Sequence, residues 1–235
     1  MARRLFVAAL VLAFVSPGSA AATPTLSHFS VTPSTVVAGG HPDLRVSQRF
    51  SEPAVLKDLS LHLPAGLTAD PRAIPFCPRR KLLANLCSTR SKVGSITVVG
   101  VAYGFELPVT RKIYNVRYGP AEKLRLAVPI LGTYSQPGIA AELPVTARPA
   151  DGGLDMTVTG LPSDVAGIPL RVREFSFWLK GVARTHKRRK IVKKNFLTNP
   201  LSCTPAVSTL VVTLHDQPAA PLSAASSFTP VGCAT

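Results

Sequence analysis

The chain has 235 residues, a formal net charge of +15 and only 6% aromatic residues. This is enough chain to bury a real hydrophobic core, and the positive charge favours long-range attraction to anionic surfaces without indicating a fold. The sequence contains no GxSxG, HExxH, P-loop or GxGxxG motif, so the enzyme classes that these motifs mark are not predicted. We therefore expect a non-catalytic chain without a cofactor.

Residues 1–22 have the order of a secretory signal peptide. The basic pair Arg3 and Arg4 precedes a short apolar run, which ends in a Pro-Gly break and small residues. The run is shorter than the roughly 20 residues that span a bilayer as a helix, so we expect a signal and not an anchor. Ala20 and Ala22 supply the small residues that place cleavage after Ala22. The sequence thus predicts a secreted or extracytoplasmic protein.

Apolar and polar residues alternate through much of the remaining chain, which is typical of half-buried antiparallel strands. In three clear strands the residues expected to face the core are Leu59, Leu61 and Leu63, then Leu124, Leu126, Val128 and Ile130, and then Leu210, Val212 and Leu214. Segment 94–104 is apolar on both faces, as a central strand is. Further strands are expected near 26–32, 43–50, 107–118, 138–147, 153–160, 168–182 and 224–231. The pattern predicts an all-β fold, an antiparallel β-sandwich of Ig-like/Greek-key or jelly-roll type that forms a single domain over 23–235.

The four cysteines, Cys77, Cys87, Cys203 and Cys233, lie in a chain that is predicted to be exported. An even number of cysteines in an oxidising compartment favours two disulfides over free thiols. Three pairings exist, and we favour the local one, Cys77 with Cys87 and Cys203 with Cys233. On the loop-entropy account these bridges contribute about 3 and about 4 kcal/mol. Zinc is disfavoured because there is no CxxC pair and no histidine at finger spacing.

The segment between Cys77 and Cys87 is the exception to the strand pattern. In PRRKLLANLC, Leu82, Leu83 and Leu86 fit a short helix. Ten residues of continuous helix would separate the two cysteines by about 15 Å, whereas a disulfide allows about 4.4–6.8 Å between α-carbons. We therefore expect a helix of one or two turns at most.

A run of basic residues between Arg184 and Lys194 contains no carboxylate. Its candidate contacts to a polyanion are Arg184, Lys187, Arg188, Arg189, Lys190, Lys193 and Lys194. We expect a solvated basic loop at 183–195, because like charges repel one another. Two alternatives are nicking by proteases and salt-sensitive, unspecific binding of anionic envelope polymers, a membrane surface or extracellular nucleic acid. Specific nucleic-acid recognition is not expected because the run lacks interleaved aromatic residues.

Three further features have both a functional and a structural interpretation. Trp178, the only tryptophan, lies on the more polar face of its predicted strand, where it either stacks a sugar or, as we expect, covers the sheet. Asp151 and Asp155 offer oxygens for calcium, but a glycine-rich turn explains them more simply. Glu142 and Glu174 are carboxylates for a glycosidase pair, although their spacing gives no support for that role.

The strings NFLTNPLSC at 195–203 and SFTPVGC at 227–233 are the most specific of several strings in the mature chain. In these strings the chain resembles an uncharacterised β-rich module of secreted actinobacterial proteins. The resemblance runs from about Phe29 to Cys233 and implies one extracellular β-rich unit, with no catalytic or ligand residues to transfer. The basic segment departs from it, because the corresponding segment of that module is mixed or acidic and rich in proline.

These observations lead to two hypotheses of function. The first is a non-catalytic exported module with a structural or adhesive role at the cell envelope. The alternative is a polyanion-binding protein that acts through Arg184 to Lys194, with help from Arg79 to Lys81. Its partners would be anionic envelope polymers or a membrane surface.

Overall fold

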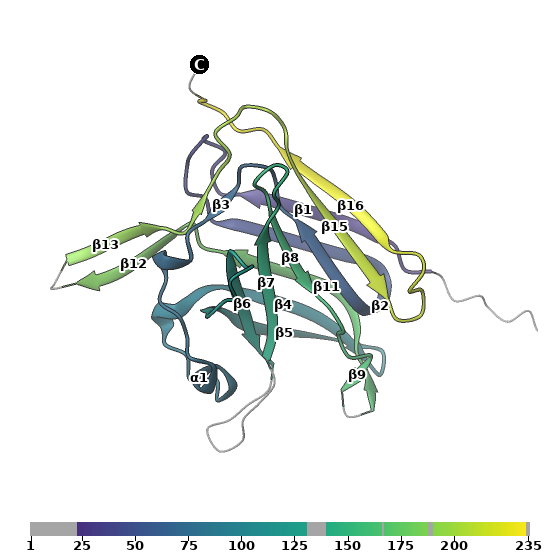
Figure 1. The fold of residues 1–235 in the computed structure, drawn as a ribbon. Coiled ribbons are helices and arrows are strands. Elements are labelled where there is room, and N and C mark those ends of the chain that lie inside the picture. The colour runs from purple at the N-terminus through teal and green to yellow at the C-terminus, as the bar shows by residue number, and fades with distance from the viewer. Residues whose placement is uncertain (1–22, 131–139, 166, 188–189, 234–235) are drawn as a thin grey trace, which may run out of the picture.

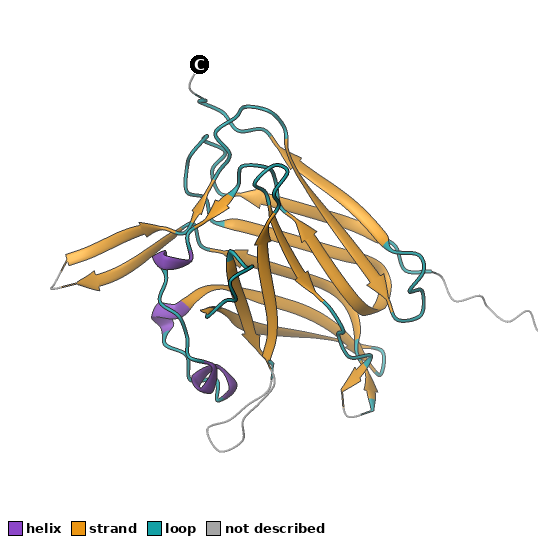
Figure 2. Cartoon of the chain, in the orientation of Figure 1, coloured by secondary structure: helices purple, strands orange, loops and turns teal. Residues whose placement is uncertain are grey.

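The computed structural model describes residues 23–130, 140–165, 167–187 and 190–233, so the predicted signal peptide at 1–22 lies outside the described residues. Antiparallel strands dominate the described chain (Figures 1 and 2). The main sheet contains β1 (Leu26–Pro33), β2 (Leu44–His62), β4 (Lys92–Ala102), β5 (Phe105–Val116), β6 (Leu124–Pro129), β7 (Ala140–Ala147), β8 (Leu154–Val158), β11 (Arg171–Leu179), β15 (Ala206–Leu214) and β16 (Leu222–Phe228). Smaller sheets pair β3 (Thr68–Ala69) with β14 (Leu197–Thr198), β9 (Asp164–Val165) with β10 (Ile168–Pro169), and β12 (Val182–Lys187) with β13 (Lys190–Asn195). The helical elements are η1 (Pro71–Ala73), α1 (Arg79–Leu83) and η2 (Thr89–Ser91).

Seven strands of the main sheet close into a barrel. β11 pairs with β4 along one edge and with β2 along the other, while β2 also pairs with β8. The strand order therefore runs β2, β11, β4, β5, β6, β7, β8 and back to β2. The all-β, antiparallel character predicted from the sequence is confirmed. The more specific expectation of a sandwich is not confirmed, because β2 closes these strands on themselves.

β2 is a 19-residue strand that belongs to two groups of strands. Its first half pairs with β1 and β11, and its second half pairs with β8 and β15, which in turn pairs with β16. The sequence predicted separate strands here, around 43–50 and 55–63. Pro53 lies in the irregular stretch between Arg49 and Ala54, where the pairing of β2 with β11 is interrupted, so its missing N–H breaks no ladder bond and the strand continues through it.

One hydrophobic core fills the barrel and extends to β1 and β15. The residues predicted to face inward are buried at Leu61, Leu63, Leu124, Leu126, Val128, Leu210, Val212 and Leu214. Leu59 is only partly buried, and Ile130 is 41% exposed because β6 ends at Pro129. β4 is flanked by β5 and β11 as a central strand is, but it is half-buried. Alternation therefore predicted most of these core residues, and it failed at Leu59 within β2 and at Ile130 just after β6.

Two disulfides join cysteines that are near in sequence. Cys77 is bonded to Cys87 and Cys203 to Cys233, with α-carbons 5.5 and 5.8 Å apart, which is the local pairing expected from the sequence. α1 has only 5 residues and lies inside the first loop, as the short helix predicted there should. Two disulfides fit a secreted or extracellular protein. In the part of the chain that the structure describes, no helix is long and apolar enough to cross a membrane.

Candidate functional site

The basic segment is a β-hairpin, so the loop predicted at 183–195 is wrong. β12 and β13 pair along their whole length. Arg188 and Arg189 connect them, and both lie outside the described residues. In Figure 1 the hairpin extends away from the barrel, at the left of the view. The candidate residues for polyanion contact that the structure describes, Arg184, Lys187, Lys190, Lys193 and Lys194, thus belong to a projecting hairpin.

Local propensity and the base of the hairpin explain why this segment forms strands. Val182, Ile191 and Val192 are β-branched, and such residues favour extended backbone. At the base, Phe196 N–H donates to the Gly181 carbonyl at 2.7 Å, which ties the end of β13 to the start of β12. Phe196 itself is buried in the core. In the sequence, the many lysine and arginine residues of this segment favoured the interpretation as a solvated loop over that as two strands.

Positive charge on the hairpin is not compensated within it. Arg184 faces Lys193 across the two strands, and Lys187 faces Lys190. Like charges directly opposite each other destabilise a strand pair. Alternation places Arg184 and Lys193 on one face of the hairpin and Lys194 on the other. These three residues are exposed, and none of them forms an ion pair with a described residue.

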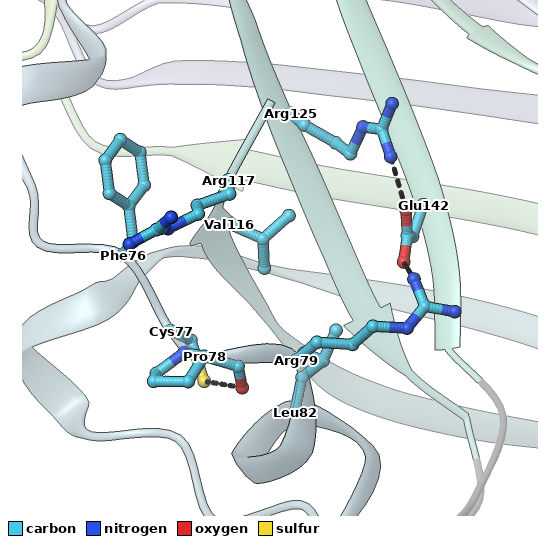
Figure 3. A pocket seen from close by; sticks show the side chains of 9 residues that line it. All are labelled: Phe76, Cys77, Pro78, Arg79, Leu82, Val116, Arg117, Arg125 and Glu142. Carbon is cyan, nitrogen blue, oxygen red and sulfur yellow. Dashed lines mark hydrogen bonds and ion pairs between the residues drawn. The ribbon is translucent and has the colours of Figure 1, made fainter. Parts of the chain in front are cut away.

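A pocket of about 450 Å³ lies outside the barrel core (Figure 3). Tyr114 and Val116 of β5 form a small buried cluster with Cys77 and Leu82, separate from the main core. Segment 76–82 therefore covers the outer face of this part of the sheet, and the pocket lies between the two. The residues that line it are Phe76, Cys77, Pro78, Arg79, Leu82, Val116, Arg117, Arg125 and Glu142.

Ion pairs between arginine and glutamate form the polar side of the pocket. Glu142 on β7 accepts hydrogen bonds from Arg79 at 2.6 Å and from Arg125 at 2.8 Å. Arg125 also binds Glu122, through its Nε at 2.8 Å and through its Nη2. The hydrogen bonds that Arg125 donates to Glu122 lower the pKa of Glu122, and the same hydrogen bonds raise the pKa of Arg125. Arg79, which the sequence associated with polyanion contact, is thus held at the pocket.

Arg117 is the third arginine of the pocket and follows β5 directly. It is exposed, and its side chain has no hydrogen-bond or ion-pair partner among the described residues. In Figure 3 it lies beside Phe76. The two carboxylates of the network compensate Arg79 and Arg125, so the charge of Arg117 remains free.

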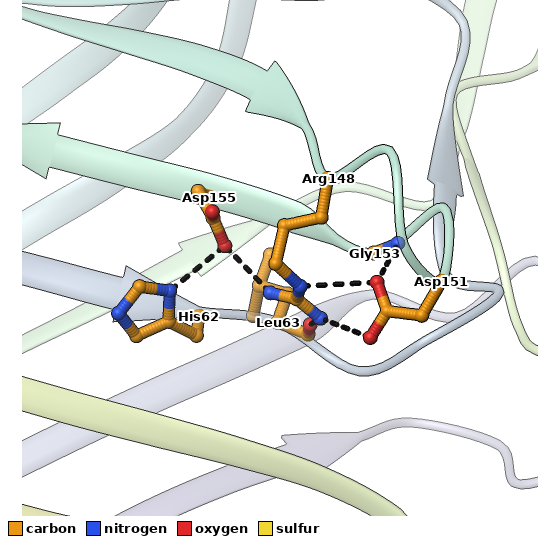
Figure 4. A network of polar contacts seen from close by, with 6 residues as sticks. All are labelled: His62, Leu63, Arg148, Asp151, Gly153 and Asp155. Atoms are coloured by element: carbon orange, nitrogen blue, oxygen red, sulfur yellow. Dashed lines mark hydrogen bonds and ion pairs between the residues drawn. The ribbon is translucent and has the colours of Figure 1, made fainter.

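Asp151 and Asp155 are both bound by one arginine (Figure 4). Arg148 contacts Asp151 through Nε at 3.0 Å and Asp155 through Nη1 at 2.5 Å, and it donates to the Leu63 carbonyl at 2.8 Å. The hydrogen bond from Arg148 lowers the pKa of Asp151. His62 Nδ1 lies 2.9 Å from Asp155 Oδ1. The aspartates thus serve the turn between β7 and β8 and connect it to the end of β2.

Glu142 and Glu174, considered as a glycosidase pair, belong to separate ion pairs. Glu174 lies 3.9 Å from Arg49 on the paired strands β11 and β2, whereas Glu142 is part of the pocket network. Trp178 is half-buried, and Lys92 Nζ lies 5.4 Å from the centre of its ring. This packing agrees with a ring that covers the sheet.

The pocket was not predicted because its residues come from four separate segments of the chain. Within residues 23–130, 140–165, 167–187 and 190–233, no three histidine, cysteine or carboxylate side chains gather as a metal site requires. Comparison of the chain with protein-family models, curated proteins and solved structures found no match. The interpretation of function therefore depends on the hairpin and the pocket.

Proposed function

We propose that this protein is a non-catalytic exported module with an adhesive role at the cell envelope, and that it contacts anionic envelope polymers through the β12–β13 hairpin. The observation that carries this proposal is the exposed charge of the hairpin. Arg184, Lys193 and Lys194 lie on a projecting arm and have no carboxylate partner among the described residues.

Repulsion within the hairpin makes a polyanion a suitable partner. A two-stranded hairpin is marginally stable in water by itself, and Arg184 opposite Lys193 weakens it further. A polymer with regularly spaced negative charges neutralises both strands at once. Binding of this kind is salt-sensitive and depends little on the fine structure of the polymer.

Export is supported by three independent features. The order of residues 1–22 is that of a signal peptide, the four cysteines form two disulfides, and NFLTNPLSC and SFTPVGC resemble an extracellular module. All three features support an exported protein, as the proposed adhesive role at the cell envelope requires.

The test compares retention on a wall preparation and on an anionic resin at several salt concentrations. The hairpin variant is R184Q/K193Q/K194Q, and the matched control, R90Q/R111Q/K112Q, removes the same number of exposed charges elsewhere. We expect the control to elute close to wild type and the hairpin variant to elute at clearly lower salt. The slope of log Kd against the logarithm of the salt concentration should become smaller by roughly one for each charge that is removed from the contact, as it does for phosphate contacts.

Equal retention of the two variants would show that net charge alone governs binding and would contradict the hairpin proposal. Binding to vesicles of phosphatidylglycerol and phosphatidylcholine tests the remaining alternative, in which the partner is a membrane surface. If the hairpin governs binding to these vesicles but not to the wall preparation, the partner is a membrane surface and not a polymer.

A further inference from the structure

We propose that the pocket between segment 76–82 and strands β5–β7 binds a small organic anion with an apolar body, and that Arg117 holds its charged group. This site is distinct from the hairpin and goes beyond the proposed function. The ligand class follows from the walls, the charge and the rigidity of the pocket.

The size and walls of the pocket suit a small molecule with an apolar part. Its volume of about 450 Å³ lies in the range of roughly 300–1,000 Å³ that is usual for such sites. Val116 and Leu82 are buried and form apolar walls, while Phe76 is 41% exposed and offers part of its ring. Figure 3 shows Phe76 and Arg117 at the same side of the pocket. An aromatic or acyl body packed against these walls therefore brings its charged end to Arg117.

The charges of the pocket favour an anion. Arg125 is engaged on three of its nitrogens, and both oxygens of Glu142 accept from arginines. The carboxylates therefore have little capacity for a cation. Arg117 is left with a free planar guanidinium, which matches a carboxylate, sulfonate or phosphate group in a bidentate manner.

The walls are held in place without a ligand. The Cys77–Cys87 disulfide closes the covering segment on itself, and Cys77 N–H donates to the Asn115 carbonyl of β5 at 2.7 Å. Buried Asn115 also donates its side-chain amide to the carbonyls of Pro71 and Ile74, at 2.9 and 2.7 Å. A ligand thus meets a site that needs little ordering, which favours binding.

A purely structural contact between the covering segment and the sheet explains why Leu82 and Val116 are buried. It does not explain the unpaired guanidinium of Arg117 beside Phe76, whose ring packs edge-on against Tyr118 with 5.8 Å between centroids and is still 41% exposed. Arg117 and Phe76 are therefore the residues on which the test depends.

The test titrates the full mature chain with 8-anilinonaphthalene-1-sulfonate and with N-phenyl-1-naphthylamine, its analogue without the sulfonate, and follows fluorescence. R117Q is compared with R90Q, which removes an exposed arginine outside the pocket. We expect saturable binding of one sulfonate probe per chain. R117Q should weaken this binding about tenfold or more, as expected for one charge-assisted hydrogen bond, and R90Q should change it less than about twofold. The neutral analogue should bind wild type and R117Q equally.

F76A and F105S locate the probe. Phe105 is 72% exposed at the far end of β5, where a hydrophobic probe would also adsorb. Loss of binding in F76A but not in F105S supports the pocket. The proposal is overturned if binding is not saturable, if F105S abolishes it, or if R117Q and R90Q behave alike. Since R117Q leaves the hairpin intact, these results are independent of the retention experiment.

Discussion

Asn199 donates its side-chain amide to the backbone carbonyl of Thr35 at 2.8 Å, and to that of Val37 at 3.0 Å. Asn199 is 1% exposed, so its buried side chain fixes the loop between β1 and β2 by hydrogen bonds. N199A should lower the free energy of unfolding by about 1–3 kcal/mol, because carbonyls lose their donor. Urea unfolding followed by circular dichroism measures the change. N195A removes an exposed asparagine of the same NFLTNPLSC string and should have little effect; an equal loss in both variants would contradict a specific role for Asn199.

Gly94 and Gly100 both lie on β4 opposite β11, but only one of them is sterically required. A Cβ on Gly94 would lie 1.8 Å from the Trp178 carbonyl oxygen, whereas a Cβ on Gly100 would lie 3.7 Å from that of Arg171. G94A should therefore lower the free energy of unfolding by about 3 kcal/mol or more, because the backbone of β4 or β11 must move. G100A should lie within about 1 kcal/mol of wild type. Thermal melts of the two variants decide the matter, and similar melting temperatures would show that the strands are further apart than described.

Tyr103 occupies the turn between β4 and β5 with φ of 51°, followed by Gly104 with φ of 82°. This left-handed backbone favours Asn-Gly and is strained for a large side chain. Tyr103 is 83% exposed, so its ring contributes little packing. Y103N should stabilise the protein by about 0.5–1 kcal/mol, measured as a rise in melting temperature. F105N, in the neighbouring strand, should not stabilise, and a Y103N variant that melts below wild type would show that the ring has a structural contact.

Glu122 should make the stability depend on acid pH. Its pKa is lowered from the usual 4.5, chiefly by the hydrogen bond from Arg125, so its ionised form is favoured in the folded state. The resulting stabilisation is present above about pH 4.5 and is lost as the pH falls through the lowered pKa. Urea unfolding between pH 6 and pH 3 should show a smaller loss of stability in E122Q than in wild type. E52Q, at an exposed carboxylate 4.0 Å from Arg173, serves as control and should follow wild type.

The features that were predictable from the sequence are those set by neighbours along the chain. Leu210, Val212 and Leu214 alternate with smaller or polar residues, and each is fully buried. The local disulfide pairing, favoured among three possible pairings, is confirmed, and the Cys77–Cys87 bridge limited the expected helix to a short one. In these places local geometry left few alternatives.

Barrel closure depends instead on pairing between distant strands. Phe177 on β11 lies opposite both Val46 on β2 and Ile96 on β4, and no residue pattern within β11 indicates two such partners. The continuity of β2 through Pro53 likewise depends on distant strands, because β11 does not pair with β2 at that position. A sandwich and a barrel present the same alternation in each strand, so the sequence alone did not separate them.

The candidate sites show the same limit in two forms. The charge of Arg184 to Lys194 was visible, but charge dominated the interpretation and the β-branched residues that extend this segment were given too little weight. The pocket network joins Arg79, Arg125 and Glu142 from three elements. Only the close spacing of Glu122 and Arg125 was a sequence signal, and by itself it indicates no pocket.

The string NFLTNPLSC, which contains Asn199, also contacts the closing SFTPVGC string. Val231 accepts from the Ala38 N–H and donates to the Val36 carbonyl, each at 2.9 Å, and the Cys203–Cys233 disulfide joins the two strings. The loop after β1 is therefore held by contacts with both strings.

The long strand β2 should make unfolding of the described chain cooperative. The barrel loses its closure if β2 leaves β8 or β11, and the pair β15–β16 is also joined to the main sheet through β2. Because both groups of strands share β2, we expect the described chain to denature in one cooperative transition. Amide protons in the middle of β2 should be among the last to exchange with solvent deuterium, because their opening requires that global event.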